Sequence, residues 1–389
     1  MSVSISKSFT LTPPLQLNIG NRRWTSFVLY FSIGFVFALV YACVLVVMLE
    51  SLSLWINVIL LGISLIGTLL FYYVHYIIVG NRILTFFRYQ LFLIFFNTII
   101  LYSINENILS HLDIIILSIA VIQAWGRIGC LHAGCCYGIP CDCRFKIQYA
   151  KEHIKSGFPD YLIGVPLFPI QLVESIGVFL IISFLTIEML YSYIPGEAGM
   201  TYLVMYAMLR FFLELRRADT QRSYWMSLSE AQWVSIFTCT TVCILSVLNL
   251  VQIPNYVFWL TAILLVVSTI LIISRYVRNP KSFLLHPFHI KEIDRLIKNT
   301  YDKCLNEKEF PTCCKIESTS QGINYSYEKL EKDSSVYFIF SFSSNTHKMP
   351  DIFIKTLMKM IQNIFREYGF FSCKTPKKDV FQFVFLKYN

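Results

Sequence analysis

Charged residues are scarce in this 389-residue sequence. Asp, Glu, Lys and Arg together make up 15% of it, whereas a soluble globular domain usually carries about 25%. Hydrophobic residues make up 56%, and the mean hydropathy is +0.58. This composition excludes a single soluble globule and a disordered chain. It also excludes a nucleic-acid-binding protein that relies on a basic face.

We expect no cleavable secretory signal in this sequence, and no internal repeat is evident. Residues 1–23 are polar and contain no apolar signal core, and the apolar run that follows is long enough to cross a membrane. We therefore expect residues 1–24 to form a polar segment ahead of a membrane domain.

Long apolar runs occupy the chain up to residue 277. A hydrocarbon core of about 30 Å needs about 20 apolar residues in a helix, and helices pair their own backbone groups in lipid. The sequence predicts such helices at residues 25–48, 54–79, 85–103, 111–131, 168–193, 198–215, 231–250 and 255–276. The predicted fold class is an all-α polytopic membrane protein of about seven to eight transmembrane helices, over residues 25–277.

The last part of the chain differs in composition. Residues 278–389 contain 18 of the 33 Lys and Arg residues and 12 of the 24 Asp and Glu residues. Apolar residues have helical spacing over 289–304 and 350–368, and strand-like patterns rich in aromatic residues occupy 336–343 and 380–386. We expect a small soluble α+β domain without a catalytic motif, which favours a docking or regulatory role.

Arginine and glutamate residues occur near the ends of three predicted helices, although a charge at the membrane centre costs about 2.5–3.5 kcal/mol. Together with one glutamine they are Arg127, Gln171, Glu174, Arg210, Glu214 and Arg217. Arg210, Glu214 and Arg217 fall at i, i+4 and i+7 and form one polar stripe. Either these charges pair and reach the interface, or the arginines bind a lipid phosphate, whose oxygens match the guanidinium fork.

Five of the twelve cysteines lie close together in the sequence, beside one histidine: Cys130, His132, Cys135, Cys136, Cys141 and Cys143. Their spacing lacks the paired C-x2-C halves of a structural zinc site, and we expect no metal ion and no cofactor. Disulfides in an oxidising compartment, or inert packing thiols, are the other interpretations.

Three motifs follow one another in the membrane part. Residues 126–138 read GRIGCLHAGCCYG, residues 168–174 read FPIQLVE, and residues 206–217 read YAMLRFFLELRR. In this order they resemble the motifs G-R-x-G-N-F-x-N-x-E-x-x-G, H-P-S-Q-L-Y-E and Y-x-x-x-R-F-x-x-E-x-x-R of the prolipoprotein diacylglyceryl transferase family. The resemblance covers roughly residues 25–250.

Several positions depart from the family pattern. Cys130, Ala133 and Cys135 replace Asn, Asn and Glu of the first motif, and Phe168 replaces the His of the second. In the second predicted helix, Ile66 stands where the family has a His. His75 lies nine residues further on, about 180° around the helix, and does not replace it. The phosphate-binding arginines are kept, whereas a proton-handling His is missing.

The resemblance implies transfer of the diacylglyceryl group from phosphatidylglycerol to a cysteine thiol of a lipobox-containing protein, in a bacterial plasma (inner) membrane. The implied catalytic residues are Arg127, Arg210, Glu214, His132 and Glu174. The implied lipid-binding residues are Arg127, Gly129, Gly138, Gln171, Arg210 and Arg217. Because the thiolate is the nucleophile, the acceptor needs a base, for which His132, Glu174 and Glu214 are the candidates.

Other functions remain open at the level of sequence. A catalytically degenerate homologue would use the same arginines to bind anionic lipid and would present a partner-binding domain. A membrane thiol-redox or metal protein would use the cysteine cluster. No nucleic acid is expected as a partner.

The orientation in the membrane has two opposite predictions. Lys and Arg concentrate in the N-terminal segment, the 80–88 turn, the 132–167 and 216–230 loops and the C-terminal domain. The positive-inside rule places these in the cytoplasm, whereas the family resemblance implies the other side for the first motif. With eight helices both termini share one side in either case.

Overall fold

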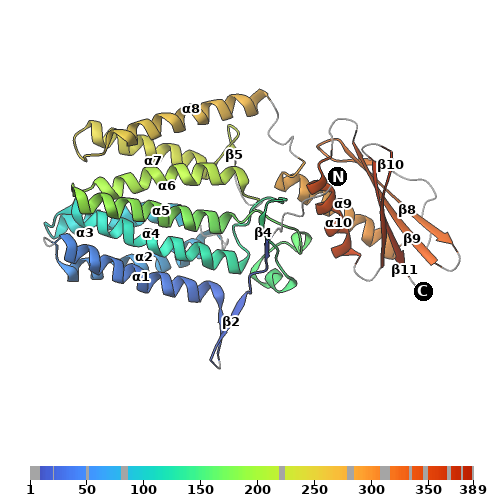
Figure 1. Cartoon of the computed structure of the whole chain (residues 1–389), viewed down its shortest axis with the longest axis horizontal. Coiled ribbons are helices and arrows are strands. Elements are labelled where there is room, and N and C mark those ends of the chain that lie inside the picture. The colour runs from blue at the N-terminus through green and yellow to red at the C-terminus, as the bar shows by residue number, and fades with distance from the viewer. Residues whose placement is uncertain are drawn as a thin grey trace, which may run out of the picture.

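A bundle of roughly parallel helices forms the larger part of the protein (Figure 1). The computed structural model describes residues 9–20, 22–49, 52–79, 86–218, 224–277, 284–306, 316–332, 335–344, 349–365, 369–377 and 380–387. The bundle consists of α1 (Ser26–Leu49), α2 (Leu54–Val79), α3 (Phe86–Ser103), α4 (Ile108–Ala133), α5 (Ile170–Tyr191), α6 (Glu197–Leu213), α7 (Glu230–Val247) and α8 (Asn255–Val277). Each helix lies where an apolar run predicts it, and the predicted helical membrane fold is confirmed.

Six of these helices, α1 and α4 to α8, are long and apolar enough to cross a membrane, judged over the described residues. In the same residues α2 and α3 provide the shorter apolar stretches Leu54–Gly67 and Leu93–Ser103. Helix α4 is the centre of the bundle, because it packs against α1, α2, α3, α5 and α6. Every residue from Ser110 to Ala124 is accordingly buried.

A side chain of the central helix α4 holds the turn between α5 and α6 in place. Gly196, in the predicted Pro195-Gly196 break, has a φ of +87°. The Asp113 carboxylate, on α4, accepts hydrogen bonds from the backbone N–H groups of Gly196 and Gly199, both at 2.7 Å. It therefore caps the N-terminus of α6, where a negative charge is favourable. No local pattern in the sequence predicts this role of Asp113.

The polar connection between α4 and α5 contains only short elements. These are β4 (Phe145–Ile147), η1 (Lys151–Ser156) and η2 (Asp160–Leu162). Strand β1 (Phe9–Leu11) pairs in parallel with β4, and β2 (Gln16–Ile19) forms a hairpin with β3 (Arg22–Thr25) ahead of α1. Near α6 lie η3 (Glu214–Arg216) and a second hairpin of β5 (Tyr224–Trp225) and β6 (Leu228–Ser229). The N-terminal segment is thus joined to the connection that contains the cysteines.

The C-terminal region contains a five-stranded antiparallel sheet with strand order β10-β11-β9-β8-β7. Its elements are α9 (Pro287–Asn306), β7 (Glu317–Ser318), β8 (Ile323–Lys332), β9 (Ser335–Ser344), α10 (Asp351–Ile364), β10 (Gly369–Lys377) and β11 (Val380–Lys387). Figure 1 shows α9 and α10 between the sheet and the bundle. Both helices and strands β9 and β11 lie where the sequence predicts them, whereas β7, β8 and β10 were not predicted.

Polar and apolar contacts join the C-terminal region to the α4–α5 connection. Lys298 Nζ lies 2.9 Å from Asp160 Oδ2, and Lys355 Nζ lies 2.8 Å from Asp142 Oδ2. Asn363 Nδ2 donates to the Ile163 carbonyl at 2.8 Å. Helix α10 also packs against η2.

Apolar burial rather than charge is expected to hold this contact. Exposed ion pairs contribute about 0–1 kcal/mol each, so replacing Lys298 and Lys355 together by Ala should lower the melting temperature only slightly. Leu162 is 3% exposed, and truncating such a leucine costs about 2–5 kcal/mol. Thermal unfolding in detergent should show a much larger loss for Leu162→Ala. Equal losses in the two variants would contradict this account.

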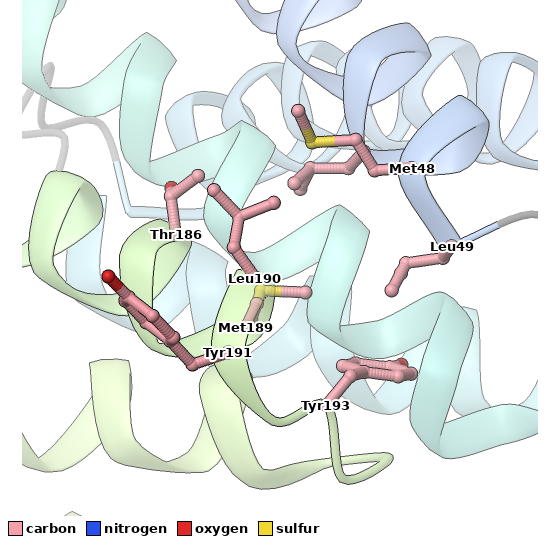
Figure 2. A pocket seen from close by; sticks show the side chains of 8 residues that line it. Met48, Leu49, Thr186, Met189, Leu190, Tyr191 and Tyr193 are labelled. Atoms are coloured by element: carbon pink, nitrogen blue, oxygen red, sulfur yellow. The ribbon is translucent and has the colours of Figure 1, made fainter.

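A cavity of about 340 Å³ lies where α1 and α5 end. Figure 2 shows its mainly apolar lining: Leu45, Met48, Leu49, Thr186, Met189, Leu190, Tyr191 and Tyr193. Because Glu174 lies at the other end of α5, this cavity is not part of the site described below.

Candidate functional site

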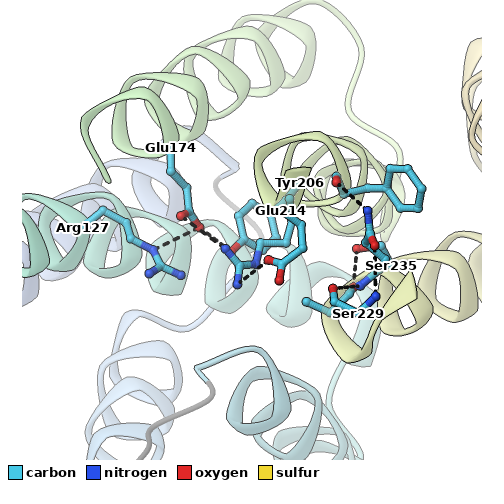
Figure 3. Close-up of polar contacts among 10 residues, drawn as sticks. Arg127, Glu174, Tyr206, Glu214, Ser229 and Ser235 are labelled. Carbon is cyan, nitrogen blue, oxygen red and sulfur yellow. Dashed lines mark hydrogen bonds and ion pairs between the residues drawn. The ribbon is translucent and has the colours of Figure 1, made fainter. Parts of the chain in front are cut away.

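Arginine and glutamate side chains from three helices meet at one end of the bundle (Figure 3). Arg127 Nε on α4 lies 3.0 Å from Glu174 Oε1 on α5. Arg210 Nη1 on α6 lies 3.6 Å from Glu174 Oε2, and Arg210 Nη2 lies 3.3 Å from Glu214 Oε2. The three sequence motifs thus converge in a single chain of ion pairs.

This ion-pair chain is deeply buried. The Glu174 side chain is only 1% exposed, and those of Arg127 and Arg210 are 10% and 9% exposed. The Tyr206 hydroxyl adds a hydrogen bond to Glu174 Oε1 at 2.9 Å. Burying charges costs least when they are paired and hydrogen-bonded, and Glu174 pairs with both arginines at once.

The two arginines nevertheless keep donors for a ligand. Arg127 contacts Glu174 through Nε, and its two Nη atoms lie on the other side of the guanidinium group (Figure 3). Arg210 Nη1 is buried and makes no hydrogen bond within the described part of the chain. Planar guanidinium forks of this kind bind phosphate oxygens at two points.

The first motif is held against both neighbouring motifs by its backbone. Ile139 N–H donates to the Arg216 carbonyl at 2.9 Å, and Ala218 N–H donates to the Tyr137 carbonyl at 3.0 Å. Gly138 lies between them, and a Cβ there would be 2.5 Å from the Phe168 carbonyl oxygen. Gly138 therefore permits a close backbone approach, and it forms an isolated β-bridge with the buried Arg217. Arg127, Arg210 and Arg217 are called the arginine cluster below.

Gly138→Ala should destabilise the protein, because the added methyl group meets backbone atoms that cannot rotate away. Overpacking costs about 1–3 kcal/mol, which should appear as a lower melting temperature in detergent. Gly62→Ala is the matched control, since a Cβ at Gly62 meets nothing within 4 Å. A Gly138→Ala protein as stable as the control would exclude this role.

Gln171 contacts the cysteine segment rather than an arginine. Its Nε2 donates to the Cys135 carbonyl at 2.8 Å and to the Tyr149 hydroxyl at 3.2 Å. Tyr149 in turn donates to the Leu131 carbonyl at 3.0 Å. Gln171 therefore fixes the backbone that follows α4. This role of Tyr149 could not be predicted from the sequence, since an isolated tyrosine in a loop gives no recognisable signal.

The five cysteines of residues 130–143 divide into two groups. Cys141 and Cys143 form a disulfide, whereas the Sγ atoms of Cys130, Cys135 and Cys136 lie within 4.8 Å of one another as free thiols. Hydrogen bonds from the other two thiols, and then the positive charges of Arg217 and Arg127, hold the pKa of Cys136 well below its ordinary value.

His132 and Gly129 lie on the side of α4 that faces α1 and the N-terminal segment. His132 Nδ1 is 3.0 Å from the Pro14 carbonyl oxygen, and its ring stacks on Tyr30. A Cβ at Gly129 would lie 3.1 Å from the Phe27 ring, so this glycine lets α1 approach α4. Neither residue contacts the arginines in the structure.

Ile66, where the family has a His, is 66% exposed on α2 and is not among the side chains that contact the arginine cluster. Of the residues discussed above, the side chain of His75 lies outside the described part of the structure, as do residues 80–85 and 219–223 of the two basic loops.

Comparison with known proteins agrees with the three motifs. The family model of prolipoprotein diacylglyceryl transferase matches residues 14–248. The chain is 36% identical over 134 residues to phosphatidylglycerol–prolipoprotein diacylglyceryl transferase 2 of Clostridium perfringens, which covers 34% of this chain and 48% of the relative. It is 32% identical over 134 residues to phosphatidylglycerol–prolipoprotein diacylglyceryl transferase of Clostridium tetani, covering 34% of this chain and 51% of the relative.

The chain spans about half the length of these curated relatives. The family match is longer, covers more than half of the chain and includes every helix that contributes to the ion-pair chain. The protein belongs to the prolipoprotein diacylglyceryl transferase family.

Proposed function

We propose that the protein transfers a diacylglyceryl group from phosphatidylglycerol to a cysteine thiol of a prolipoprotein-like substrate. The observation that carries this proposal is the buried Arg127–Glu174–Arg210 ion-pair chain. In it Glu174 fixes both guanidinium groups, while the two Nη atoms of Arg127 point away from Glu174 and can donate to a phosphate. Both relatives carry the name of this activity.

The chemistry follows from where charge develops. The acceptor sulfur attacks the glyceryl carbon, the bond from that carbon to the phosphate oxygen breaks, and glycerol phosphate leaves with the electron pair. Arg127 and Arg210 stabilise the negative charge that grows on the phosphate, and such preorganised donors are most effective in a buried site. Arg217 adds a third positive charge beside Glu174.

The other expected site residues receive different roles. Glu174 holds the arginines, and Glu214 pairs with Arg210. Gln171 and Gly138 position the segment after α4, and Gly129 sets the distance between α1 and α4. His132 and Glu214 remain the candidate bases for the acceptor thiol, with His132 requiring a shift of its contacts to the N-terminal segment.

We further propose three parts for the chain: a polar segment at 1–24, the transferase domain at 25–277 and a soluble domain at 278–389 that serves docking or regulation. The multi-pass bundle would lie in a bacterial plasma membrane. The contacts of Lys298 and Lys355 with the α4–α5 connection support a C-terminal domain that stays close to the site.

A second candidate function is binding of anionic lipid without transfer. It is favoured by Ile66 at the position of the family His, and by Cys130 and Cys135 at positions where the family has Asn and Glu. Such a protein would keep the arginine cluster and use the C-terminal domain to contact a partner.

The test is transfer by the purified full chain in detergent, given a lipobox peptide and different lipid donors. Phosphatidylglycerol should add a diacylglyceryl mass to the peptide, whereas phosphatidylcholine should add much less. Phosphatidylglycerol binding without any mass gain would favour the second candidate.

A further inference from the structure

Three thiols that the proposed transfer does not yet use lie beside the arginine cluster. Cys130 is in the last turn of α4, and Cys135 and Cys136 follow the helix directly. All three residues are partly exposed and free of disulfides, and their Sγ atoms lie within 4.8 Å of one another.

The backbone is bent to bring these thiols together. Gly134 ends α4 with a φ of +75°, and Cys136 has a φ of +55°, which non-glycine residues rarely adopt. These two residues turn the chain back toward Cys130, while Gln171 holds the carbonyl of Cys135. A strained conformation persists only where its surroundings fix it, and such sites are often functional.

The cluster has the donors and the dimensions of a catalytic zinc site. Zinc binds thiolate sulfur at about 2.3 Å, so the ligands of a tetrahedral ion lie about 3.8 Å apart. The observed separations of up to 4.8 Å require an inward movement of at most about 1 Å to reach that geometry. Three protein ligands with an open fourth position distinguish catalytic from structural zinc.

The surrounding charges suit such a centre. Zinc with three thiolates carries one net negative charge, and the Arg127 and Arg217 guanidinium groups both interact electrostatically with Cys136. The three guanidinium groups of the cluster exceed its two carboxylates, Glu174 and Glu214, by one charge. The loaded site would therefore be neutral, which lowers the cost of burying it.

We propose that Cys130, Cys135 and Cys136 bind a zinc ion whose open position takes the acceptor thiol. This inference rests on the proposed transferase function and supplies thiol activation that does not need a His at position 66. The bound thiol releases its proton to solvent and becomes a thiolate. Its sulfur forms the new bond to the glyceryl carbon as the carbon–oxygen bond breaks, and the ion stays Zn²⁺ throughout.

The first experiment measures the metal in the full chain, purified in detergent with reductant and without chelator. Elemental analysis should find about one zinc per chain. After chelation, Co²⁺ should give a thiolate-to-cobalt charge-transfer absorption that Zn²⁺ abolishes. Absence of both the zinc and the cobalt absorption would overturn the inference.

The second experiment changes single thiols. Cys130→Ser, Cys135→Ser and Cys136→Ser should each weaken zinc binding at least ~10-fold, because even residues that only support metal ligands cost this much. Cys43→Ser and the double variant Cys141→Ser/Cys143→Ser are the controls and should bind zinc as the wild type does. Unchanged zinc binding in all three cluster variants would overturn the site. If a variant fails to fold, the wild-type protein still decides, because a wild type purified without zinc overturns the site by itself.

Transfer assays separate this inference from the proposed function. Transfer that is lost on chelation and restored by Zn²⁺ supports both. Transfer that survives complete removal of zinc overturns the inference and leaves the transferase intact. Zinc bound by the three cysteines in a protein that never modifies the peptide overturns the proposed function while the metal site stands.

Discussion

Replacing Arg127 by Lys should reduce transfer by about 100- to 1,000-fold, the loss typical of removing one preorganised donor to a developing oxyanion. The Lys ammonium can still pair with Glu174, but it cannot offer a second, planar pair of donors to a phosphate. Folding should therefore be largely kept while the reaction is lost. The rate of peptide modification with phosphatidylglycerol measures the effect.

Arg216→Ala is the matched control for this substitution. Arg216 is an exposed arginine of the third motif, and its guanidinium group lies over the Phe168 ring rather than in the ion-pair chain. Its loss should leave the rate within a few-fold of the wild type, because exposed charges contribute little. If Arg127→Lys were as active as Arg216→Ala, Arg127 would not be a phosphate ligand.

Replacing Glu174 by Ala should have the largest effect on stability. The change leaves Arg127 and Arg210 buried without their shared carboxylate, and breaking a buried pair by removing one partner costs about 3–5 kcal/mol. We expect a low yield of folded protein and a strongly reduced melting temperature in detergent.

Glu188→Ala, on the same helix, is the comparison for this loss. Glu188 accepts a hydrogen bond from the Tyr256 hydroxyl at 2.9 Å and is only partly buried, so its removal should cost about 0.5–1.5 kcal/mol. Glu174→Gln keeps the shape and the acceptor for Tyr206 but removes the charge, and it should fall between the two. A Glu174→Ala protein as stable as Glu188→Ala would contradict the role of Glu174 as the shared partner.

The membrane helices could be predicted from the sequence because a bilayer imposes their length and apolar character. The spacing of Arg210 and Glu214 likewise predicts that the two side chains lie together, and the ion pair between them is present although α6 ends at Leu213 and Glu214 begins η3. The contacts between side chains of different helices could not be predicted from the sequence, since no local pattern joins Arg127 to Glu174. The capping of α6 by Asp113 could not be predicted for the same reason, because Asp113 lies on another helix.

The cysteine cluster shows what spacing alone does not reveal, because Cys130, Cys135 and Cys136 lie together although the paired spacing of a structural zinc site is missing. Linear spacing assumes regular metal-binding turns, whereas here a helix end and two left-handed residues bring Cys130 next to Cys136. Strands β7, β8 and β10 were missed for a related reason, because pairing with neighbours rather than local pattern determines strands. The parallel pairing of β1 with β4 depends on contact between distant segments.

The most direct test of the central claim measures both products in one reaction. Wild-type protein in phosphatidylglycerol vesicles is given a lipobox peptide, and lipidated peptide and glycerol phosphate are quantified together, with Arg210→Ala as the control. If the arginine site catalyses diacylglyceryl transfer, the wild type should form equal amounts of the two products and the variant should form neither. Glycerol phosphate without lipidated peptide, or the same yields from Arg210→Ala, would contradict it.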